Sequence, residues 1–521
     1  MSSLVHEGVT SMKLTPQQQD VIDWVKNGSG HAFVTAVAGA GKTTTLLKAA
    51  GAARGNVSIV AFNNKIVREI EGKVAKMGFG NRVRVMTFHS AGFRAWRYRH
   101  KDVVLDAKKK RDLLTEICGV HPLLSNFVFK LVGFAKMRAV GIAEDEKLLE
   151  TWTTIVDRYD LENELDIEAD ENQDFADERD MLLKGIATAQ KVLEAGRRIA
   201  AKVIDFDDMI YMAIYDKTCQ PFQVDWVFVD EAQDSSPARR LLAKKMLKPG
   251  GRTLWVGDDR QAIYAFAGAD TDAVEQIRRD FKATDLPLTV TFRCPKSVVA
   301  EAQKIVSHIE AHELAPDGIV REAEYKDILT EKLGAEDFVL CRVTKPLVKL
   351  AFQLIARGTP CYIEGRDFGD GLKKIVQQLQ GRSKKAISVG YFLERLDNWE
   401  QRGVSKAREA DQGARAQIIE DQAECLRVIS QGCPDTDCII KKIDNLFKDA
   451  DGERKPMTCL STIHRAKGRE ADRVFFLGRE RYCPSPWAKT EEDLIQEENL
   501  IYTAITRAMR ELVFVSMPNE K

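Results

Sequence analysis

Residues 31–44 read HAFVTAVAGAGKTT. An apolar run that suits a buried strand leads into a Gly-rich turn, and the turn opens a segment with helical character, TTTLLKAA. The turn ends in Lys42-Thr43, as in loops whose backbone N–H groups and following helix hold phosphate oxygens. The strict pattern has glycine at position 36, where this chain has alanine, and a chance Gly-Lys-Thr in a surface loop is the alternative. The strand-turn-helix order favours an ATP-binding loop.

This loop assigns roles to individual residues. We expect Lys42 to reach the β- and γ-phosphates and Thr43 to hold Mg²⁺. The residues expected to surround the nucleotide phosphates are Gly39, Ala40, Gly41, Lys42, Thr43 and Thr44.

A second apolar run, WVFV, leads into Asp230-Glu-Ala-Gln-Asp234. Carboxylates at the end of a buried strand are costly unless they meet a metal or act as a base. Asp230 suits the Mg²⁺ shell, and Glu231 suits activation of the attacking water. The alternative is a capping carboxylate followed by a charged helix.

Other apolar runs place these two sites in a larger α/β fold. They begin near Val57, Val83 and Thr253, and a later series begins near Asp337, Cys361, Met457 and Arg473. Each early run stops at a polar cluster, as ligand-binding strands do at the carboxyl edge of a parallel sheet. Two stretches, roughly residues 92–195 and 366–456, show helical patterns instead. The sequence therefore predicts two α/β cores, each interrupted by a mainly helical insertion.

The amino-acid composition limits the classes of protein to which this chain can belong. The 521 residues include 78 Lys+Arg and 78 Asp+Glu, so the formal charge of +0 leaves room for a basic groove balanced by acidic surface elsewhere. Residues 164–180 carry nine acids and one arginine, which is typical of a solvated or flexible segment.

The ten cysteines have no repeated CxxC spacing, and Cys425, Cys433 and Cys438 lack a fourth zinc-like ligand, so we expect reduced thiols. No stretch suits a membrane span, and we expect a cytoplasmic protein, associated with the nucleoid in a bacterial or phage setting.

With these motifs in order, the chain resembles superfamily 1 helicases of the UvrD/Rep type. The matching segments are Leu14-Thr-Pro-Gln-Gln18, Ala61-Phe-Asn-Asn-Lys65, Thr87-Phe-His-Ser90, Asp205-Phe-Asp-Asp208, DEAQD at 230–234, GDDRQAIYAFAGA at 257–269, LTVTFR at 288–293, TIHRAKGRE at 462–470 and ENLIYTAITRA at 498–508. The wording FNNK and TFHSAGFRAW also resembles the F-box helicase branch and its phage or bacterial relatives. With 14 residues after Arg507, we expect no fused nuclease domain.

The resemblance implies an α/β fold with two RecA-like parallel-sheet cores around the P-loop, each with a mainly helical insertion. The predicted domain bounds are 1–91 and 196–283 for the first core, 92–195 for its insertion, 284–365 and 457–521 for the second core, and 366–456 for its insertion. The second insertion is short for the family's second accessory domain.

The resemblance also implies roles at the ATP site. Gln18 would read the adenine edge, Phe292 would stack on adenine in place of a tyrosine, and Glu470 would face the ribose. Gln261 would orient water or touch the γ-phosphate. Arg293 and Arg507 would stabilise the charge of phosphoryl transfer.

A single strand of DNA needs stacking faces and phosphate donors. By the resemblance, Phe62, Tyr264 and Phe266 would stack on bases, although an aromatic residue taken alone is more often part of a core than a stacking platform. The expected polar contacts to the strand are Asn64, Lys65, His89, Ser90 and His464.

The resulting prediction is an ATP- and Mg²⁺-dependent translocase and helicase that acts on single-stranded DNA and single-strand/duplex junctions, moving 3′→5′. One alternative is a DNA-stimulated ATPase that remodels or clears protein–DNA complexes without productive unwinding. A degenerate binding module is the non-enzymatic alternative, and the intact Lys42, Glu231, Arg293 and Arg507 argue against it.

Overall fold

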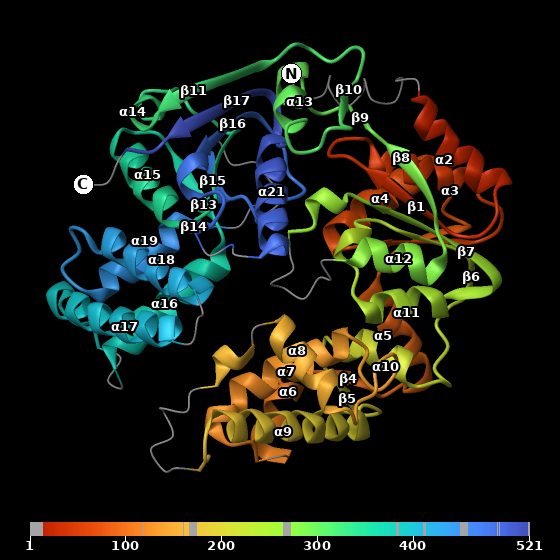
Figure 1. Ribbon diagram of the computed structural model, residues 1–521, viewed down its shortest axis with the longest axis horizontal. Coiled ribbons are helices and arrows are strands. Elements are labelled where there is room, and N and C mark those ends of the chain that lie inside the picture. The colour runs from red at the N-terminus through yellow and green to blue at the C-terminus, as the bar shows by residue number, and fades with distance from the viewer. Residues whose placement is uncertain are drawn as a thin grey trace. The chain divides into compact units, whose positions relative to one another are not determined.

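The computed structural model describes most of the chain. The described ranges are 14–117, 119–159, 161–165, 174–263, 272–381, 385–409, 413–448, 457–486, 488 and 490–518. Residues up to Ala36 together with Gly41–Leu288 form a first compact unit, and Val37–Ala40 together with Thr289 onward form a second (Figure 1).

The first unit contains a six-stranded, wholly parallel sheet in the order β3-β2-β6-β7-β1-β8. Its strands are β1 (Ala32–Ala36), β2 (Val57–Ala61), β3 (Val83–Thr87), β6 (Val224–Val229), β7 (Leu247–Gly257) and β8 (Thr284–Leu288). β2 is buried along its whole length, as expected of an inner strand covered on both faces. Because β1, β6 and β7 are neighbours and parallel, their carboxyl ends lie at one edge of the sheet.

Helices precede and connect these strands. They are α2 (Pro16–Asn27), α3 (Lys42–Ala52), α4 (Asn64–Lys76), α5 (Phe88–Arg99), α10 (Asp208–Tyr215), α11 (Pro237–Lys245) and α12 (Ala273–Phe281). α5 packs closely on α10 at Gly92, where an added Cβ would lie 2.1 Å from the carbonyl oxygen of Met209. Glycine is therefore needed at this helix contact.

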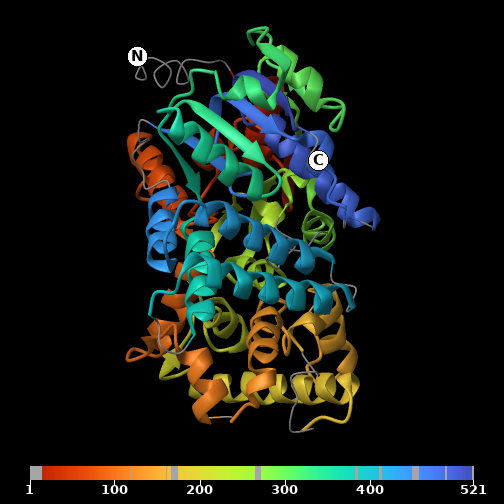
Figure 2. The same ribbon diagram turned by 90° about the vertical axis from the view of Figure 1, so that its left-hand side faces the viewer.

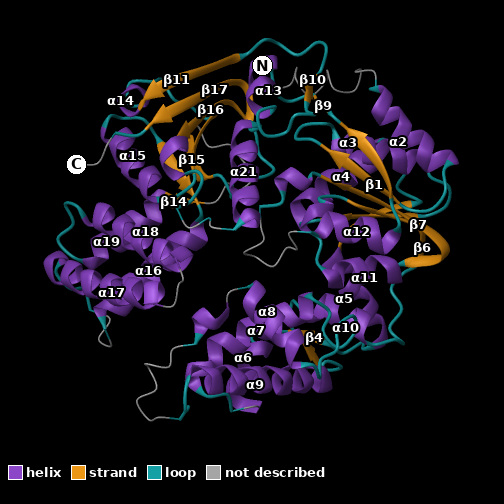
Figure 3. Cartoon of the chain, viewed as in Figure 1, coloured by secondary structure: helices purple, strands orange, loops and turns teal. Residues whose placement is uncertain are grey.

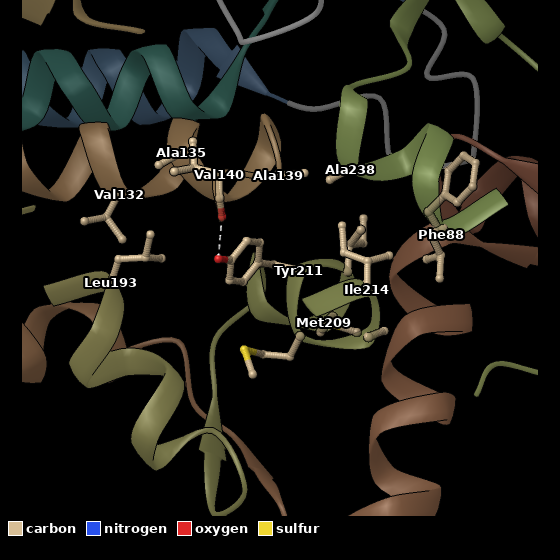
Figure 4. Close-up of a cluster of buried hydrophobic side chains, with 14 of the residues drawn as sticks. Phe88, Val132, Ala135, Ala139, Val140, Leu193, Met209, Tyr211, Ile214 and Ala238 are labelled. Carbon is tan, nitrogen blue, oxygen red and sulfur yellow. Dashed lines mark hydrogen bonds between the residues drawn. The ribbon is translucent and has the colours of Figure 1, made fainter. Parts of the chain in front are cut away.

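A helical insertion completes the first unit. It contains β4 (Val104–Leu105), α6 (Lys109–Asp112), α7 (Ser125–Met137), α8 (Leu149–Arg158), α9 (Glu178–Ile199) and β5 (Val203–Ile204), and β4 pairs with β5. Both ribbon views show α9 running along one side of the shorter helices (Figures 1 and 2). Side chains from α5, α7, α9 and α10 share one buried cluster, in which the Tyr211 hydroxyl donates to the Val140 carbonyl at 2.7 Å (Figure 4). The insertion and the core therefore form one packed body.

The second unit contains a seven-stranded parallel sheet in the order β11-β17-β16-β12-β15-β13-β14. Its strands are β11 (Ile319–Glu324), β12 (Asp337–Cys341), β13 (Cys361–Glu364), β14 (Phe447–Lys448), β15 (Thr458–Thr462), β16 (Ala471–Leu477) and β17 (Ala508–Ser516). A separate two-stranded sheet is formed by β9 (Val290–Thr291) and β10 (Glu310–Ala311). β12 is buried throughout and lies at the centre.

Helices cover this sheet and form its insertion. They are α13 (Lys296–Ala302), α14 (Tyr325–Ile328), α15 (Lys345–Ala356), α16 (Arg366–Gln380), α17 (Val389–Glu409), α18 (Gly413–Ser430), α19 (Thr436–Leu446), α20 (Arg479–Tyr482) and α21 (Glu491–Ile505). Side chains of α16–α19 join those of β12, β13 and α15 in one hydrophobic core. Figure 3 shows these four helices grouped together, next to β14.

The α/β class with parallel sheets and helical segments is confirmed, and each predicted apolar run forms a strand. Sequence patterns missed β8, which contains Pro287, and β11, an edge strand with polar residues and no fully buried position. They also missed β17. Helix α5 crosses residue 92 and α9 crosses residue 195, so the exact domain bounds stay a prediction. Among the described residues, no helix has both the length and the apolar character to cross a membrane.

Candidate nucleotide and nucleic-acid sites

The P-loop lies between β1 and α3, as the sequence predicted. β1 ends at Ala36, and α3 begins at Lys42 behind Gly41, whose φ of 75° lies in the left-handed region that glycine adopts without strain. The Thr45 hydroxyl donates to the Gly41 carbonyl at 3.1 Å and secures the turn. Lys42, Thr43 and Thr44 therefore occupy the first turn of a helix, where free backbone N–H groups attract anions.

The acidic box follows the carboxyl end of β6. The Lys42 ammonium lies 3.5 Å from the Glu231 carboxylate, so the P-loop and the acidic box meet at the shared edge of the sheet. Glu231 has a φ of 51°, a conformation that costs energy for a residue with a side chain and that is concentrated at functional sites. Burial, together with the neighbouring Glu231, raises the pKa of Asp230 to about 7.

Another buried acid, Asp258, directly follows the end of β7. Burial raises the pKa of Asp258 to about 6, against the opposing charge of Lys42. Gln261 donates from its amide nitrogen to the Asp258 carboxylate at 2.5 Å. Gln261, predicted to act beside the γ-phosphate, thus belongs to the same polar cluster as Lys42.

Gln233 is a linking residue that the sequence motifs left without a role. Its amide nitrogen donates to Glu231 at 2.6 Å, and its amide oxygen accepts from the Asp258 backbone at 3.2 Å. The approach is so close that a Cβ on Gly257 would lie 2.7 Å from the Gln233 amide oxygen. Gln233 therefore joins the acidic box to the residues after β7, and its place inside DEAQD was the available signal.

The donor set fits a hard divalent cation held jointly with a nucleotide. Asp230 is a buried carboxylate with a raised pKa, so its negative charge is poorly compensated by the protein alone. Among the described residues, no group of three or more His, Cys, Asp or Glu side chains is arranged around a metal position. Mg²⁺ commonly takes one or two protein ligands and fills its shell with phosphate oxygens and water. Asp230 and Thr43 suit that mode.

Gln18 caps α2 from its buried position. Its side-chain oxygen accepts from the Thr15 backbone N–H at 3.1 Å, and the Thr15 hydroxyl accepts from the Gln18 N–H at 3.2 Å. The side chain is therefore held in one orientation, and its contact with adenine stays a prediction.

The predicted strand contacts of the first unit follow β2 and β3. Phe62 comes after β2 and is 44% exposed, while Asn64 and Lys65 open α4 and face solvent. His89 stacks on Phe206 with ring centroids 3.9 Å apart, and Phe206 is 58% exposed. Burial, then the charge of Arg239, lowers the pKa of His89 to about 4, so the imidazole is neutral at pH 7.

Ser90 has a structural task in the described fold. Its hydroxyl accepts from the Thr87 N–H at 3.0 Å and donates to the Thr87 carbonyl at 2.9 Å, closing a capping box at the start of α5. Its contact with a DNA strand stays a prediction. Tyr264 and Phe266 lie outside the described residues.

Two residues beside these contacts were missed. Arg239 of α11 lies with its guanidinium 5.4 Å from the centre of the Phe62 ring. A small pocket has Phe62, Phe88, His89, Asp230, Glu231 and Arg239 among its lining residues. Phe206 is part of the Asp205-Phe-Asp-Asp208 motif, but the sequence assigned no role to it. Nothing in the sequence singled out Arg239.

The second unit holds the two predicted arginines. The Arg293 side chain pairs with Glu470 at 2.7 Å, and its Nη1 donates to the Thr506 carbonyl at 3.4 Å. Arg507 is 1% exposed, and its Nε donates to the Thr503 carbonyl at 2.9 Å. Both guanidinium groups therefore have partners inside this unit.

Phe292, Gly39, Ala40 and His464 also lie in the second unit. The Phe292 N–H donates to the Gly39 carbonyl at 3.0 Å, and an added Cβ on Gly39 would lie 2.5 Å from the Thr291 hydroxyl. The Phe292 ring lies 4.8 Å from that of His312. Burial, then the charge of Arg342, lowers the pKa of His464 to about 3, so this imidazole is neutral as well.

Comparison with known proteins identifies the family to which this chain belongs. The model of the UvrD/REP helicase N-terminal domain matches residues 14–282, more than half of the chain. This chain belongs to the UvrD/Rep helicase family. The model of the UvrD-like helicase C-terminal domain matches residues 438–519. The two parallel sheets are consistent with the family's two RecA-like cores.

Individual relatives in the family are distant. The ATP-dependent DNA helicase Rep of Salmonella typhimurium is 25% identical over 320 residues, covering 57% of this chain and 44% of Rep. DNA helicase IV of Escherichia coli is 28% identical over 325 residues, covering 54% of this chain and 46% of that protein. The helicase PcrA of Staphylococcus aureus is 25% identical over 346 residues, covering 62% and 44%. The chain thus spans less than half the length of these relatives.

Proposed function

We propose that this chain is an ATP-driven translocase on single-stranded DNA that unwinds duplexes at a single-strand/duplex junction. The observation that carries the proposal is the meeting of Lys42 with Glu231 beside a pocket that also contains Phe62 and His89. The proposed nucleotide site and the predicted strand site therefore both contribute residues to the lining of this pocket. The names of Rep and PcrA, both ATP-dependent DNA helicases, support this choice of substrate.

The chemistry follows from the residues at the edge of the first sheet. Lys42 neutralises phosphate charge, and Glu231 accepts a proton from the attacking water. Gln233 holds the Glu231 carboxylate in place. Bound Mg²⁺, held by Asp230 and Thr43, would supply further positive charge at the phosphates.

Arg293 and Arg507 contribute to hydrolysis by stabilising the charge that develops during phosphoryl transfer. A guanidinium group stabilises phosphoryl-transfer charge most strongly in a site that excludes water, and it contributes ~10³-fold or more to the rate in related chemistry. Arg293 must exchange its partner Glu470 for phosphate to do so. We therefore expect hydrolysis to depend on a rearrangement that DNA favours.

The first experiment measures ATP hydrolysis with and without oligo(dT), in Mg²⁺ and after its removal with EDTA. We expect strong stimulation by the single strand and loss of turnover without Mg²⁺. Lys42→Ala should abolish turnover because it removes the ammonium that meets the phosphates. Hydrolysis at the normal rate in Lys42→Ala would refute the P-loop assignment.

The second experiment separates unwinding from ATPase activity alone. Duplexes with only a 3′ tail, only a 5′ tail or no tail are compared in strand displacement. We propose 3′→5′ movement, so the 3′-tailed duplex should be unwound. DNA-stimulated hydrolysis without displacement of any substrate would favour the remodelling ATPase, and displacement confined to the 5′-tailed duplex would reverse the direction.

A further inference from the structure

Arg239 lies between the proposed strand site and the acidic box. It occupies the first turn of α11, and its Nη1 donates to the Asp234 carbonyl at 2.8 Å. Its guanidinium lies 5.4 Å from the centre of the Phe62 ring, and the side chain lines the same pocket as His89 and Glu231. A cation therefore stands beside two predicted strand contacts.

The charge of Arg239 is poorly compensated within the protein. Among the described residues, no carboxylate lies within ion-pairing distance of its guanidinium, whereas the next residue, Arg240, lies 3.6 Å from Asp280. Burial lowers the pKa of Arg239, and the charge of Asp234 offsets this only in part. A guanidinium offers five N–H donors, and here one has a described partner. Such a group is costly to keep unless it meets an anion.

The pocket also supplies faces for bases. Phe62 is exposed on one side, and the stacked pair of His89 and Phe206 presents a second aromatic surface. Single-strand sites combine such faces with donors that follow the backbone phosphates. Because His89 is neutral, Arg239 is the cation among these side chains.

The acidic wall of the pocket is already engaged elsewhere. The Glu231 carboxylate faces Lys42 at 3.5 Å and accepts from Gln233 at 2.6 Å. One oxygen of Asp230 accepts from the Glu231 N–H at 3.0 Å. These two acids thus have other partners, and among the described residues neither accepts a hydrogen bond from the Arg239 guanidinium.

We propose that Arg239 binds a backbone phosphate of single-stranded DNA between bases that contact Phe62 and Phe206. This inference rests on the proposed function and adds a phosphate anchor that lies beside the catalytic carboxylate. Guanidinium recognises phosphate through paired N–H donors, which a lysine ammonium cannot reproduce.

The test measures binding of fluorescent oligo(dT) over a series of salt concentrations. For Arg239→Gln we expect about tenfold weaker binding, because a charge-assisted hydrogen bond is lost. The slope of log affinity against log salt should become shallower by about 0.7, the value for one released counterion on a single strand. Arg239→Lys should keep the slope and lose part of the affinity.

Lys244→Gln is the matched control, since Lys244 lies on the same helix and is exposed. It removes the same charge and should leave the affinity and the slope nearly unchanged. Thermal melting monitors folding, and Arg239→Met, which keeps the apolar stem, replaces the Gln variant if the latter melts early.

The outcomes separate this inference from the function beneath it. Wild-type affinity and slope in Arg239→Gln would overturn the phosphate anchor, and so would weaker binding with an unchanged slope. If the wild-type protein itself fails to bind oligo(dT) and DNA leaves its ATPase unaffected, the proposed function is wrong instead.

Discussion

Two groups of charged side chains in the first unit, each with buried members, differ in how fully they are paired. In the lysine cluster, Lys109 lies 2.5 Å from Asp208, and Lys136 lies 2.8 Å from both Asp205 and Asp208. At the acidic box, the carboxylates of Asp230 and Glu231 and of the neighbouring Asp258 lie near Lys42, which approaches Glu231 to 3.5 Å. The first group balances two acids with two ammonium groups, and the second leaves carboxylates in excess.

The pKa values follow this difference. Burial works to raise the pKa of Asp208, but Lys136 and Lys109 outweigh it and the net pKa is lowered. In the acidic box, burial is not outweighed, and the pKa values of Asp230 and Asp258 rise to about 7 and about 6. A saturated group holds the insertion helices to the Asp205–Asp208 segment, whereas an unsaturated group has capacity for an external cation. Stability and chemistry should therefore separate between the two groups.

The largest expected effect is on stability in the lysine cluster. Lys136→Met leaves two buried carboxylates with one ammonium, and we expect the free energy of unfolding to fall by about 3–5 kcal/mol. Lys130→Met on the same helix removes an exposed partner of Glu164 and should cost at most about 1 kcal/mol. Urea denaturation measures both. Equal losses in the two variants would remove the distinction between buried and exposed pairs.

The next effect is on catalysis in the acidic box. Glu231→Gln should lower kcat by about a hundredfold or more, because an amide cannot accept the proton of the attacking water. We expect ATP still to bind, since Lys42 and the loop are unchanged. Steady-state ATPase assays and nucleotide titration measure the two quantities. A parallel loss of nucleotide affinity would instead mean that Glu231 mainly shapes the loop.

The third prediction concerns the excess negative charge at the acidic box, which is reflected in the pKa of Asp230. The folded pKa of Asp230, about 7, lies above its ordinary value of 3.8, so the folded protein keeps a proton that the unfolded chain releases. Stability contributed by this group therefore falls as pH rises from about 4 to about 7 and stays constant above that.

Asp230→Asn abolishes this loss. Without nucleotide or divalent cation, the variant should be more stable than wild type at pH 8 by up to about 4 kcal/mol, the value that a shift from 3.8 to about 7 represents, with the difference vanishing near pH 4. Thermal unfolding across this pH range measures it. A destabilised Asp230→Asn at pH 8 would show that the acidic box is as well compensated as the lysine cluster.

The smallest effect concerns the link between Glu231 and Asp258. Gln233→Ala removes two hydrogen bonds that orient Glu231 and the segment after β7, and we expect kcat to fall about fivefold. Comparing kcat with the ATP concentration at half-maximal rate separates misorientation of the base from weaker binding. An unchanged kcat would confine Gln233 to packing.

Sequence patterns predicted the parts of the fold that depend on neighbouring residues. The run before Lys42 and the run before Asp230 are local signals, and both form the strands expected of them. The lysine cluster gave no such signal, because Lys109 and Asp208 are 99 residues apart along the chain. β11 was missed for a related reason, since its polar residues suit an edge strand only once β17 lies beside it.

For the candidate sites, the sequence by itself determined the P-loop, the acidic box and the order of motifs that identifies the family, because each is a short pattern with its own chemistry. Tertiary structure alone decided that Arg293 pairs with Glu470 and that Arg239 lies beside Phe62 with its charge only partly compensated. Residue types record which groups are charged or aromatic, whereas packing between distant segments decides which charges find partners. That distinction separates a saturated structural group from one that can bind a ligand.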